Sequence, residues 1–262
     1  MRIRDFNLIT MIGLLAFLIC AVNVWADEGE KPTASADIGV FTKYMWRGFE
    51  LSDDSFVIQP SATVGYKGFS FNMWGNLDTD VAGTSGDAKW NETDMTLSYD
   101  TSFGPVAVGA GYIYYALDGV DDAEEFYVTG GLDVFLSPTL TAYREIAELQ
   151  GWYINMGISH SFELPRGMTL DLAGSVGYYL SEDDNFVEFD DDLNPTTKKY
   201  KNLHDGQASV GLTVPLDEYF VLTPMIAYSF PLSDEADNLI TAGSISNNSG
   251  FVYGGITLSI AF

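Results

Sequence analysis

Residues 251–262 read FVYGGITLSIAF, and this stretch decides the fold class. One parity holds apolar residues and a glycine: Val252, Gly254, Ile256, Leu258, Ile260 and Phe262. The other parity is smaller and more polar: Tyr253, Gly255, Thr257, Ser259 and Ala261. A period of two is that of a β-strand with one apolar face. With an aromatic residue in its last position, the stretch predicts a strand that closes a transmembrane barrel, where one face meets lipid and every backbone group is paired.

The N-terminal residues 1–26 predict a signal peptide. Two arginines precede an apolar run at residues 8–22, and a small-residue cleavage pattern follows at residues 24–26. The run is short and wrongly flanked for a spanning helix, so an uncleaved anchor is the alternative. The one cysteine, Cys20, lies in this segment. The predicted barrel domain, residues 27–262, would therefore fold without disulfides.

The chain is acidic and apolar at once. Its formal net charge is −25, and hydrophobic residues make up 47% and aromatic residues 14% of the sequence. The negative charge argues against nucleic acid as a partner. The high apolar content argues against disorder. The acidic side chains must therefore be segregated from the apolar ones.

Twelve segments of roughly ten residues alternate like strands of a bacterial outer-membrane barrel. They are residues 34–46, 56–66, 69–78, 92–100, 105–116, 124–135, 139–144, 152–162, 168–180, 204–214, 219–230 and 251–262. The sequence therefore predicts an all-β fold, a transmembrane antiparallel β-barrel of about twelve strands.

The connections between these segments alternate in length. The longer set is residues 47–55, 79–91, 117–123, 145–151, 181–203 and 231–250. The shorter set is residues 67–68, 101–104, 136–138, 163–167 and 215–218, with Gly and Pro in most of them. A barrel with both termini in the periplasm has short periplasmic turns and long extracellular loops. The long, acidic connections are therefore expected outside the cell.

Aromatic residues on the apolar parity gather near the segment ends. One predicted ring is Tyr44, Trp46, Tyr114, Phe126, Trp152, Tyr178 and Phe230, and the other is Tyr66, Phe69, Tyr99, Phe162, Phe220 and Phe262. Two such rings suit the two membrane interfaces. A soluble β-sandwich also alternates, but it predicts neither the rings nor the loop lengths. Pro60 and Pro224 lie within segments and predict a bulge or local defect.

One motif resembles a known family. The stretch Tyr44-Met45-Trp46-Arg47-Gly48, followed by Ser52, Gln59-Pro60 and Trp74-Gly75, resembles the start of the TorF-type porins of the proteobacterial outer membrane. The resemblance covers residues 36–78 and weakens beyond them. It implies a barrel and a pore, with an aromatic-x-x-Arg-Gly at the outer end of the first strand. It implies no particular substrate.

The parity opposite to the lipid face is expected to line the interior. The residues that we expect to line a pore are Lys43, Arg47, Trp74, Asp94, Glu125, Tyr127, Tyr153, Asp171 and Tyr179. The carboxylates would set a field that attracts cations, and the two basic residues are expected to pair with one or more of them. The aromatic residues could narrow the passage or stack on a planar or sugar-like solute, and they could equally plug it.

Catalytic and metal sites find little support in the sequence. His160 and Ser161 are adjacent, so on a strand they point to opposite faces and cannot share a proton. His204 and Asp205 are neighbours in the same way. The loop 181–203 is rich in Asp and Glu, which suits calcium, but it lacks EF-hand spacing. A solvated loop, bridged to lipopolysaccharide by divalent ions, is the simpler interpretation, and no cofactor is expected.

These patterns predict a passive pore of the bacterial outer membrane for small hydrophilic solutes, either cations or neutral molecules. The alternative is a plugged barrel whose acidic loops serve adhesion or envelope integrity. The expected partners are outer-membrane lipid, lipopolysaccharide, the solutes and the barrel assembly machinery. Phe262 resembles the terminal aromatic signal that this machinery reads, so it is expected to matter for insertion more than for transport.

Overall fold

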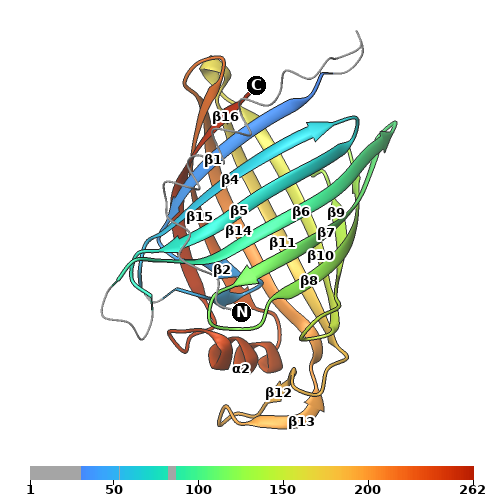
Figure 1. Cartoon of the computed structure of the whole chain (residues 1–262), viewed down its shortest axis with the longest axis vertical. Helices are drawn as coiled ribbons and strands as arrows, with labels where there is room; N and C mark the ends of the chain where they lie inside the picture. Colours follow the sequence, from blue (N-terminus) through green and yellow to red (C-terminus); the bar gives the residue numbers. More distant parts are fainter. Residues whose placement is uncertain (1–30, 53, 82–86) are drawn as a thin grey trace, which may run out of the picture.

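A computed structural model describes residues 31–52, 54–81 and 87–262 of the chain. Within these ranges, twelve strands form a closed antiparallel barrel (Figure 1). The barrel strands are β1 (Thr33–Phe41), β4 (Val57–Tyr66), β5 (Phe69–Asp78), β6 (Lys89–Phe103), β7 (Val106–Leu117), β8 (Ala123–Leu132), β9 (Thr139–Glu145), β10 (Gly151–Glu163), β11 (Thr169–Ser181), β14 (Lys201–Pro215), β15 (Phe220–Pro231) and β16 (Phe251–Ala261). The predicted strand number is confirmed. The predicted signal peptide, residues 1–26, lies outside the described residues.

The strand β16 closes the barrel against β1, as its sequence predicts. Leu258 lies opposite Ile38, and β1 pairs on its other side with β4. Backbone hydrogen bonds join Phe262 and Ala34 in both directions, at 2.9 and 3.4 Å. In the part of the barrel that the structure describes, closure leaves no free sheet edge, which is the condition for strands to cross a bilayer.

The outside of the barrel is apolar. Large hydrophobic residues of one parity are exposed on it, including Ile38 and Leu258, although exposed apolar side chains on this scale are rare in soluble proteins. The whole ring predicted near the short turns is exposed: Tyr66, Phe69, Tyr99, Phe162, Phe220 and Phe262. No helix in the described part of the chain is long and apolar enough to cross a membrane. The exterior is therefore suited to lipid.

The two ends of the barrel differ. The short turns lie at the end that carries the C-terminus, and the long connections gather at the other end with α2, β12 and β13 (Figure 1). At the short end, Lys67 and Gly68 both adopt positive φ (52° and 83°) and form a tight hairpin turn. In another short turn, backbone N–H groups of Tyr219 and Phe220 donate to Asp217 and lower the pKa of its carboxyl. We call the end with the long connections the outer end, following the predicted orientation.

Prolines and bulges interrupt the ladders locally. The pairing of β4 with β5 lapses at Gln59–Pro60, and that of β15 with β14 lapses beside Pro224, without a change of register. The predicted local defects are therefore present as gaps in one ladder each. Register shifts occur elsewhere, between Asn76 and Leu77 and between Val176 and Tyr178.

The first predicted strand, residues 34–46, is too long. β1 ends at Phe41, and the chain then turns inward to form the small hairpin of β2 (Met45–Trp46) and β3 (Phe49–Glu50). Arg47 and Gly48 connect them with φ values of 47° and 86°, which is the geometry of a two-residue hairpin turn. Tyr44 and Trp46 were expected in the outer aromatic ring, and this expectation is wrong because they follow the hairpin into the barrel.

A short helix covers the outer end. α2 (Asp234–Gly243) begins at Ser233, whose hydroxyl accepts a hydrogen bond from the backbone of Ala236, and acidic residues occupy its first turn. Its apolar face forms a small core with the hairpin and the barrel rim: Phe49, Tyr200, Ala236, Leu239, Ile240 and Phe251. The strands β12 (Val187–Phe189) and β13 (Pro195–Lys199) pair in the neighbouring loop. Helix, hairpin and rim are therefore packed together.

Candidate pore and plug

The barrel interior is filled at its outer end and open at its inner end. Tyr153 on β10 faces inward and is 5% exposed, whereas Ser159, of the same parity on the same strand, is exposed. On the neighbouring strand β11, Ala173 is likewise exposed, while Ser181 is 1% exposed. Inward side chains at the inner end therefore border solvent-accessible space. We call this space the vestibule, and its exposed inward residues include Asp100, Thr139, Ser159 and Ala173.

Residues 43–52 fill the outer half of the barrel interior, and we call them the plug. At its tip, the Arg47 guanidinium donates to both carboxylate oxygens of Glu125 on β8, Nη1 to Oε1 and Nη2 to Oε2 at 2.7 Å each. The Arg47 side chain is 9% exposed and that of Glu125 is 2% exposed. A bidentate, buried ion pair of this kind fixes position as well as charge. It joins the plug to the barrel wall.

Aromatic rings surround the same guanidinium. Its Cζ lies 4.6 Å from the ring centre of Trp46, 4.7 Å from that of Tyr143 and 4.4 Å from that of Tyr153. Its Nη1 also donates to the hydroxyl of Tyr179 at 3.2 Å. Cation–π contacts are strongest where water is excluded, as it is here. The guanidinium is therefore held by charge, hydrogen bonds and stacking together.

Other contacts hold the body of the plug. The Tyr44 hydroxyl donates to Glu92 Oε2 on β6 at 2.8 Å, and the backbone N–H of Glu50 donates to Ser244 Oγ, just after α2, at 3.1 Å. Lys43 pairs with Glu50 and with Asp54. The expectation that Lys43 neutralises Asp94, Glu125 or Asp171 is therefore wrong, because its partners lie on its own hairpin and the residues just after it. Arg47 does pair with one of the expected carboxylates.

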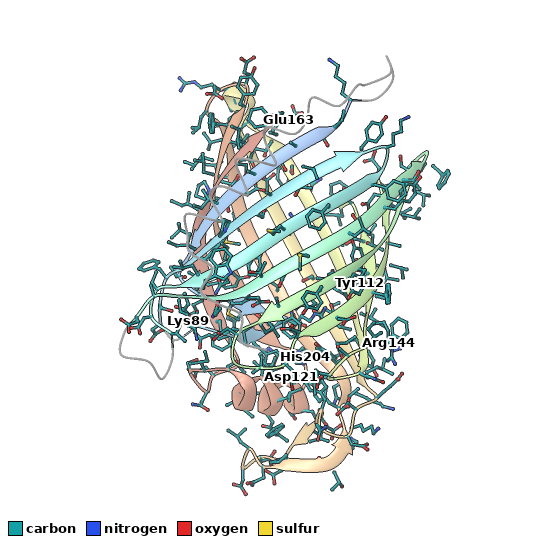
Figure 2. All side chains as sticks on the ribbon, in the orientation of Figure 1. Lys89, Tyr112, Asp121, Arg144, Glu163 and His204 are labelled. Carbon is teal, nitrogen blue, oxygen red and sulfur yellow. The ribbon has the colours of Figure 1, made fainter. Side chains whose placement is uncertain are left out.

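A bulge on β14 brings two adjacent residues into the interior. His204 and Asp205 both lie across from Gly177, so both side chains point inward, and they are 0% and 5% exposed. His204 Nε2 lies 2.9 Å from the carbonyl oxygen of Arg47, and Asp205 accepts a hydrogen bond from the Tyr153 hydroxyl at 2.8 Å. Figure 2 shows His204 at the outer end, near α2. Strict alternation places these neighbours on opposite faces, so sequence reasoning missed the pair.

Gly177 makes this arrangement sterically possible. A Cβ atom there would lie 2.2 Å from Asp205 Oδ1 and 2.4 Å from the Tyr153 hydroxyl oxygen. Both contacts are too close for any side chain. The glycine therefore leaves the space in which the carboxylate and the phenol meet.

The other predicted pore residues lie at different depths. Trp74 packs near Tyr44, with ring centres 5.7 Å apart, and it lies opposite Asp94. Asp94 Oδ1 is buried without a hydrogen-bond partner in the described part of the chain. Tyr127 packs against another tyrosine, and Asp171 lies far from the plug, where it accepts hydrogen bonds from Thr169 and Thr213. The three expected carboxylates do not form one ring.

The residues that the sequence offered for catalysis or metal binding are dispersed in the structure. His160 packs between Phe135 and Phe162 on the outside, while Ser161 bonds to Asp171 inside. In the described ranges, no three His, Cys, Asp or Glu side chains are arranged to hold a metal ion. The acidic outer loop has internal ion pairs instead. Lys199 lies 2.8 Å from Asp184 and holds the pKa of that carboxyl below its ordinary value.

Comparison with known proteins gives likeness of fold. No protein-family model and no curated protein sequence matches the chain. Among solved structures, it is similar to the KdgM porin, with a TM-score of 0.53 and 11% identity over 87% of this chain and 99% of that one. It is similar in the same way to the NanC porin, with a TM-score of 0.53 and 11% identity over 87% of this chain and 98% of that one. It is also similar to a structure of the KdgM porin in complex with disordered oligogalacturonate, with a TM-score of 0.52 and 12% identity over 87% of this chain and 99% of that one.

The fold is therefore that of an outer-membrane β-barrel. Its twelve strands form a closed barrel, its outside is apolar, and aromatic side chains lie together with ion-paired and hydrogen-bonded polar side chains inside it. Closed barrels of this kind span the bacterial outer membrane, and this chain is placed there. The predicted fold class, a transmembrane antiparallel β-barrel of about twelve strands, is confirmed.

Proposed function

We propose that this chain is an outer-membrane channel for small hydrophilic solutes and that the plug closes it in the present structure. The observation that carries the proposal is the change in exposure along the strands. Inward residues border open space at the inner end and are buried under the plug at the outer end. A barrel built only as an anchor has no need of a hydrated vestibule. Displacement of the plug would connect the vestibule with the outside.

The charges of the interior favour cations or neutral molecules. In the open part, Asp37, Asp100 and Asp171 face the lumen, whereas the basic side chains Lys43 and Arg47 are already paired in the plug. A confined passage lined by carboxylates concentrates cations and repels anions. The KdgM porin has been solved with oligogalacturonate, an acidic sugar chain. We propose a different solute class here, because an acidic chain would be repelled by this lumen.

We also propose a domain organisation, a family and a set of partners for the chain. Residues 1–26 would be a signal peptide and residues 27–262 the barrel domain, related to the TorF-type porins. Passive diffusion needs no cofactor and no catalytic step. The partners would be outer-membrane lipid, lipopolysaccharide and, during insertion, the barrel assembly machinery.

A second function is favoured by the plug itself. Its ion pair is buried, and its Phe49 is part of the small core with α2. A plug that never moves would make the chain a closed barrel whose acidic loops serve adhesion or envelope integrity. This is the alternative that any test of conduction must address.

Conductance in a planar bilayer separates the two functions. The refolded protein is inserted, and the current and the reversal potential are measured under a KCl gradient. A channel is expected to open in discrete steps and to prefer K⁺ over Cl⁻. Absence of current, both from the wild type and from a variant in which the plug is released, would establish the closed barrel. A preference for Cl⁻ would overturn the charge argument.

A further inference from the structure

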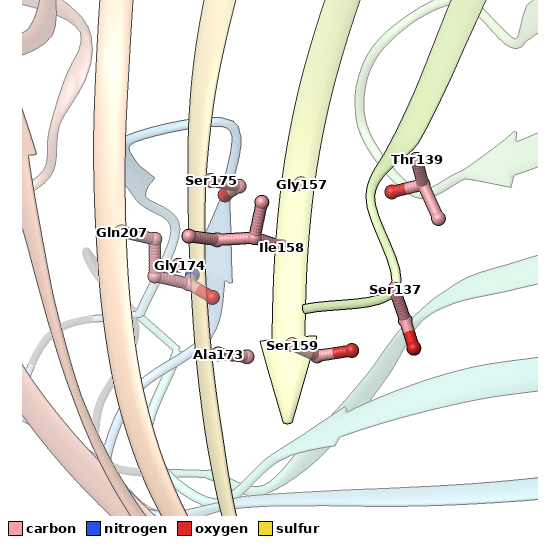
Figure 3. Close-up of a pocket in the computed structure, with 9 residues that line it drawn as sticks. All are labelled: Ser137, Thr139, Gly157, Ile158, Ser159, Ala173, Gly174, Ser175 and Gln207. Carbon is pink, nitrogen blue, oxygen red and sulfur yellow. The ribbon is translucent and has the colours of Figure 1, made fainter. Parts of the chain in front are cut away.

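One sector of the vestibule wall contains a recess. Four residues lie directly opposite one another across four neighbouring strands: Thr139 on β9, Gly157 on β10, Ser175 on β11 and Gln207 on β14. Gly157 contributes no side chain in the middle of this row, so the wall is hollowed there. The cavity has a volume of about 260 Å³ (Figure 3). Its origin is therefore one missing side chain.

The lining is neutral and rich in hydrogen-bonding groups. Ser137, Thr139, Ser159 and Ser175 contribute hydroxyl groups, and Gln207 contributes an amide. The other lining residues are Gly157, Ile158, Ala173 and Gly174, and among the described residues no charged side chain lines the recess. Figure 3 shows Thr139, Ser159, Ser175 and Gln207 on neighbouring strands around Gly157, with Ser137 in the turn before β9. This sector differs from the rest of the lumen, where carboxylates set the charge.

Several of these groups are available to a solute. Within the described residues, the hydroxyls of Thr139, Ser159 and Ser175 have no protein hydrogen-bond partner, and Ser159 and Thr139 are exposed. The Gln207 amide nitrogen donates to the Tyr253 hydroxyl at 2.7 Å, which fixes the orientation of the amide. Each hydroxyl can donate one hydrogen bond and accept two. The recess therefore offers both donors and acceptors from fixed strands.

We propose that this recess binds a neutral, polyhydroxylated solute of about monosaccharide size. The inference rests on the proposed channel function and names its solute class. A cation would find no carboxylate in the recess, and an apolar molecule would leave the hydroxyls unpaired. Pockets for drug-sized ligands have volumes of about 300–1,000 Å³, so this smaller cavity suits a pentose or a polyol. Strand-borne groups also position a ligand better than loop residues do.

Binding can be tested without conduction. The folded barrel in detergent is titrated with D-xylose, and binding is measured by saturation-transfer NMR and calorimetry. Choline and gluconate serve as cationic and anionic probes of similar size. Saturable binding of xylose is expected. Choline should bind at least about tenfold more weakly because it leaves most polar groups of the site unpaired, and gluconate should also bind at least about tenfold more weakly because the acidic lumen repels its carboxylate. Equal binding of the three probes, or no binding of xylose, would overturn the proposal.

Matched variants locate the site. Gly157→Val fills the recess, and the nearest atom to a new Cβ is the flexible Thr139 Oγ1, at 2.9 Å. Gly130→Val is the control, because a Cβ at Gly130 meets nothing within 4 Å. Xylose affinity is expected to fall at least about tenfold in the first variant and to stay unchanged in the second. Equal affinity in both would place any bound sugar elsewhere.

A second change keeps the test decisive if Gly157→Val fails to fold, which a heat-modifiability gel would show. Replacing Ser159 and Ser175 together by alanine removes two hydroxyls and adds no volume. Xylose affinity is expected to fall by about tenfold, and an unchanged affinity would refute the recess as the site. Sugar binding without any conductance would overturn the channel and leave the recess standing. Conductance without sugar binding would overturn the recess alone.

Discussion

Replacing Arg47 by alanine is expected to release the plug. The Glu125 side chain is 2% exposed in the wild type, and its described donors are Arg47 and the Tyr115 hydroxyl, the latter at 2.8 Å. In the closed arrangement of the variant, this buried carboxylate loses its basic partner and keeps Tyr115. When the plug is displaced, the same carboxylate meets water. The penalty therefore falls on the closed state and not on the open one.

The magnitude follows from the burial of the pair. Removing one partner of a buried ion pair costs about 3–5 kcal/mol, because the other charge stays buried and unpaired. About 1.4 kcal/mol corresponds to a factor of ten in an equilibrium constant. The displaced plug should therefore become roughly a hundred-fold to a few thousand-fold more populated. The ring contacts of Arg47 with Trp46, Tyr143, Tyr153 and Tyr179 are lost as well, so the lower end of this range is a minimum.

The assay is single-channel recording of the refolded variants in planar bilayers at fixed voltage. Arg47→Ala is expected to be open for most of the recording, whereas the wild type is mostly closed. Arg47→Lys should fall between them, because lysine keeps the charge but cannot bond both carboxylate oxygens or stack as a plane. Lys89→Ala is the control, because Lys89 pairs with Asp118 at the outer surface, where both side chains are 48% exposed.

Two results would refute this account. An open probability of Arg47→Ala equal to that of the wild type, in protein that folds normally, would show that the ion pair does not hold the plug. An equal rise in the open probability of Lys89→Ala would show that any loss of positive charge at the outer end opens the channel. A double-mutant cycle with Glu125→Gln adds a quantitative check, since the coupling of two residues in contact reports their interaction.

Three further outcomes are expected. Changing Asp94 and Asp171 together to asparagine should move the reversal potential toward zero, because Asp171 in the open part, and Asp94 once the plug is displaced, no longer add negative charge to the passage; an unchanged potential would place them outside the solute path. Deleting Phe262 should lower the yield of heat-modifiable barrel but not the conductance of the folded fraction, because its backbone pairs with Ala34 at the closing seam; an undiminished yield contradicts this. Ser233→Ala removes the N-cap of α2 at a cost of about 1 kcal/mol and should speed hydrogen exchange in the helix roughly fivefold, whereas exchange at the wild-type rate would show that the cap contributes nothing.

The barrel could be predicted from the sequence because lipid imposes one simple pattern. Every spanning strand must alternate, so residues 251–262 and the eleven other segments carry the same signal, and the turns carry their own. The boundary at Phe41 could not be found in this way. Tyr44 and Trp46 continue the parity of β1, although the chain has already left the barrel wall. A lumen-facing hairpin also alternates, so periodicity does not distinguish it from a longer strand.

A local signal for the hairpin was nevertheless present. Arg47-Gly48 lies between two aromatic residues, Trp46 and Phe49, that pair directly across the turn. A residue followed by glycine, flanked by a strand pattern on both sides, is typical of a two-residue hairpin turn. The pairing of Arg47 with Glu125 could be anticipated as one of several carboxylate partners. The depth of this ion pair in the barrel could not be anticipated, because sequence alone does not show how far a loop extends into the interior.

Both register shifts in the described barrel lie at the level of the plug. At one, Asn91 is an extra residue beside Glu92, and Glu92 binds Tyr44 of the plug. At the other, His204 turns inward and lies 2.9 Å from the carbonyl oxygen of Arg47. A bulge disrupts the hydrogen-bond ladder and changes the direction of a side chain. Strands that served only to close the barrel would need neither of these two bulges. A hairpin that had collapsed into an open lumen by chance would be expected to leave the wall regular. The wall is instead shaped around the plug, so the closed arrangement is specified by the barrel strands as well as by the hairpin.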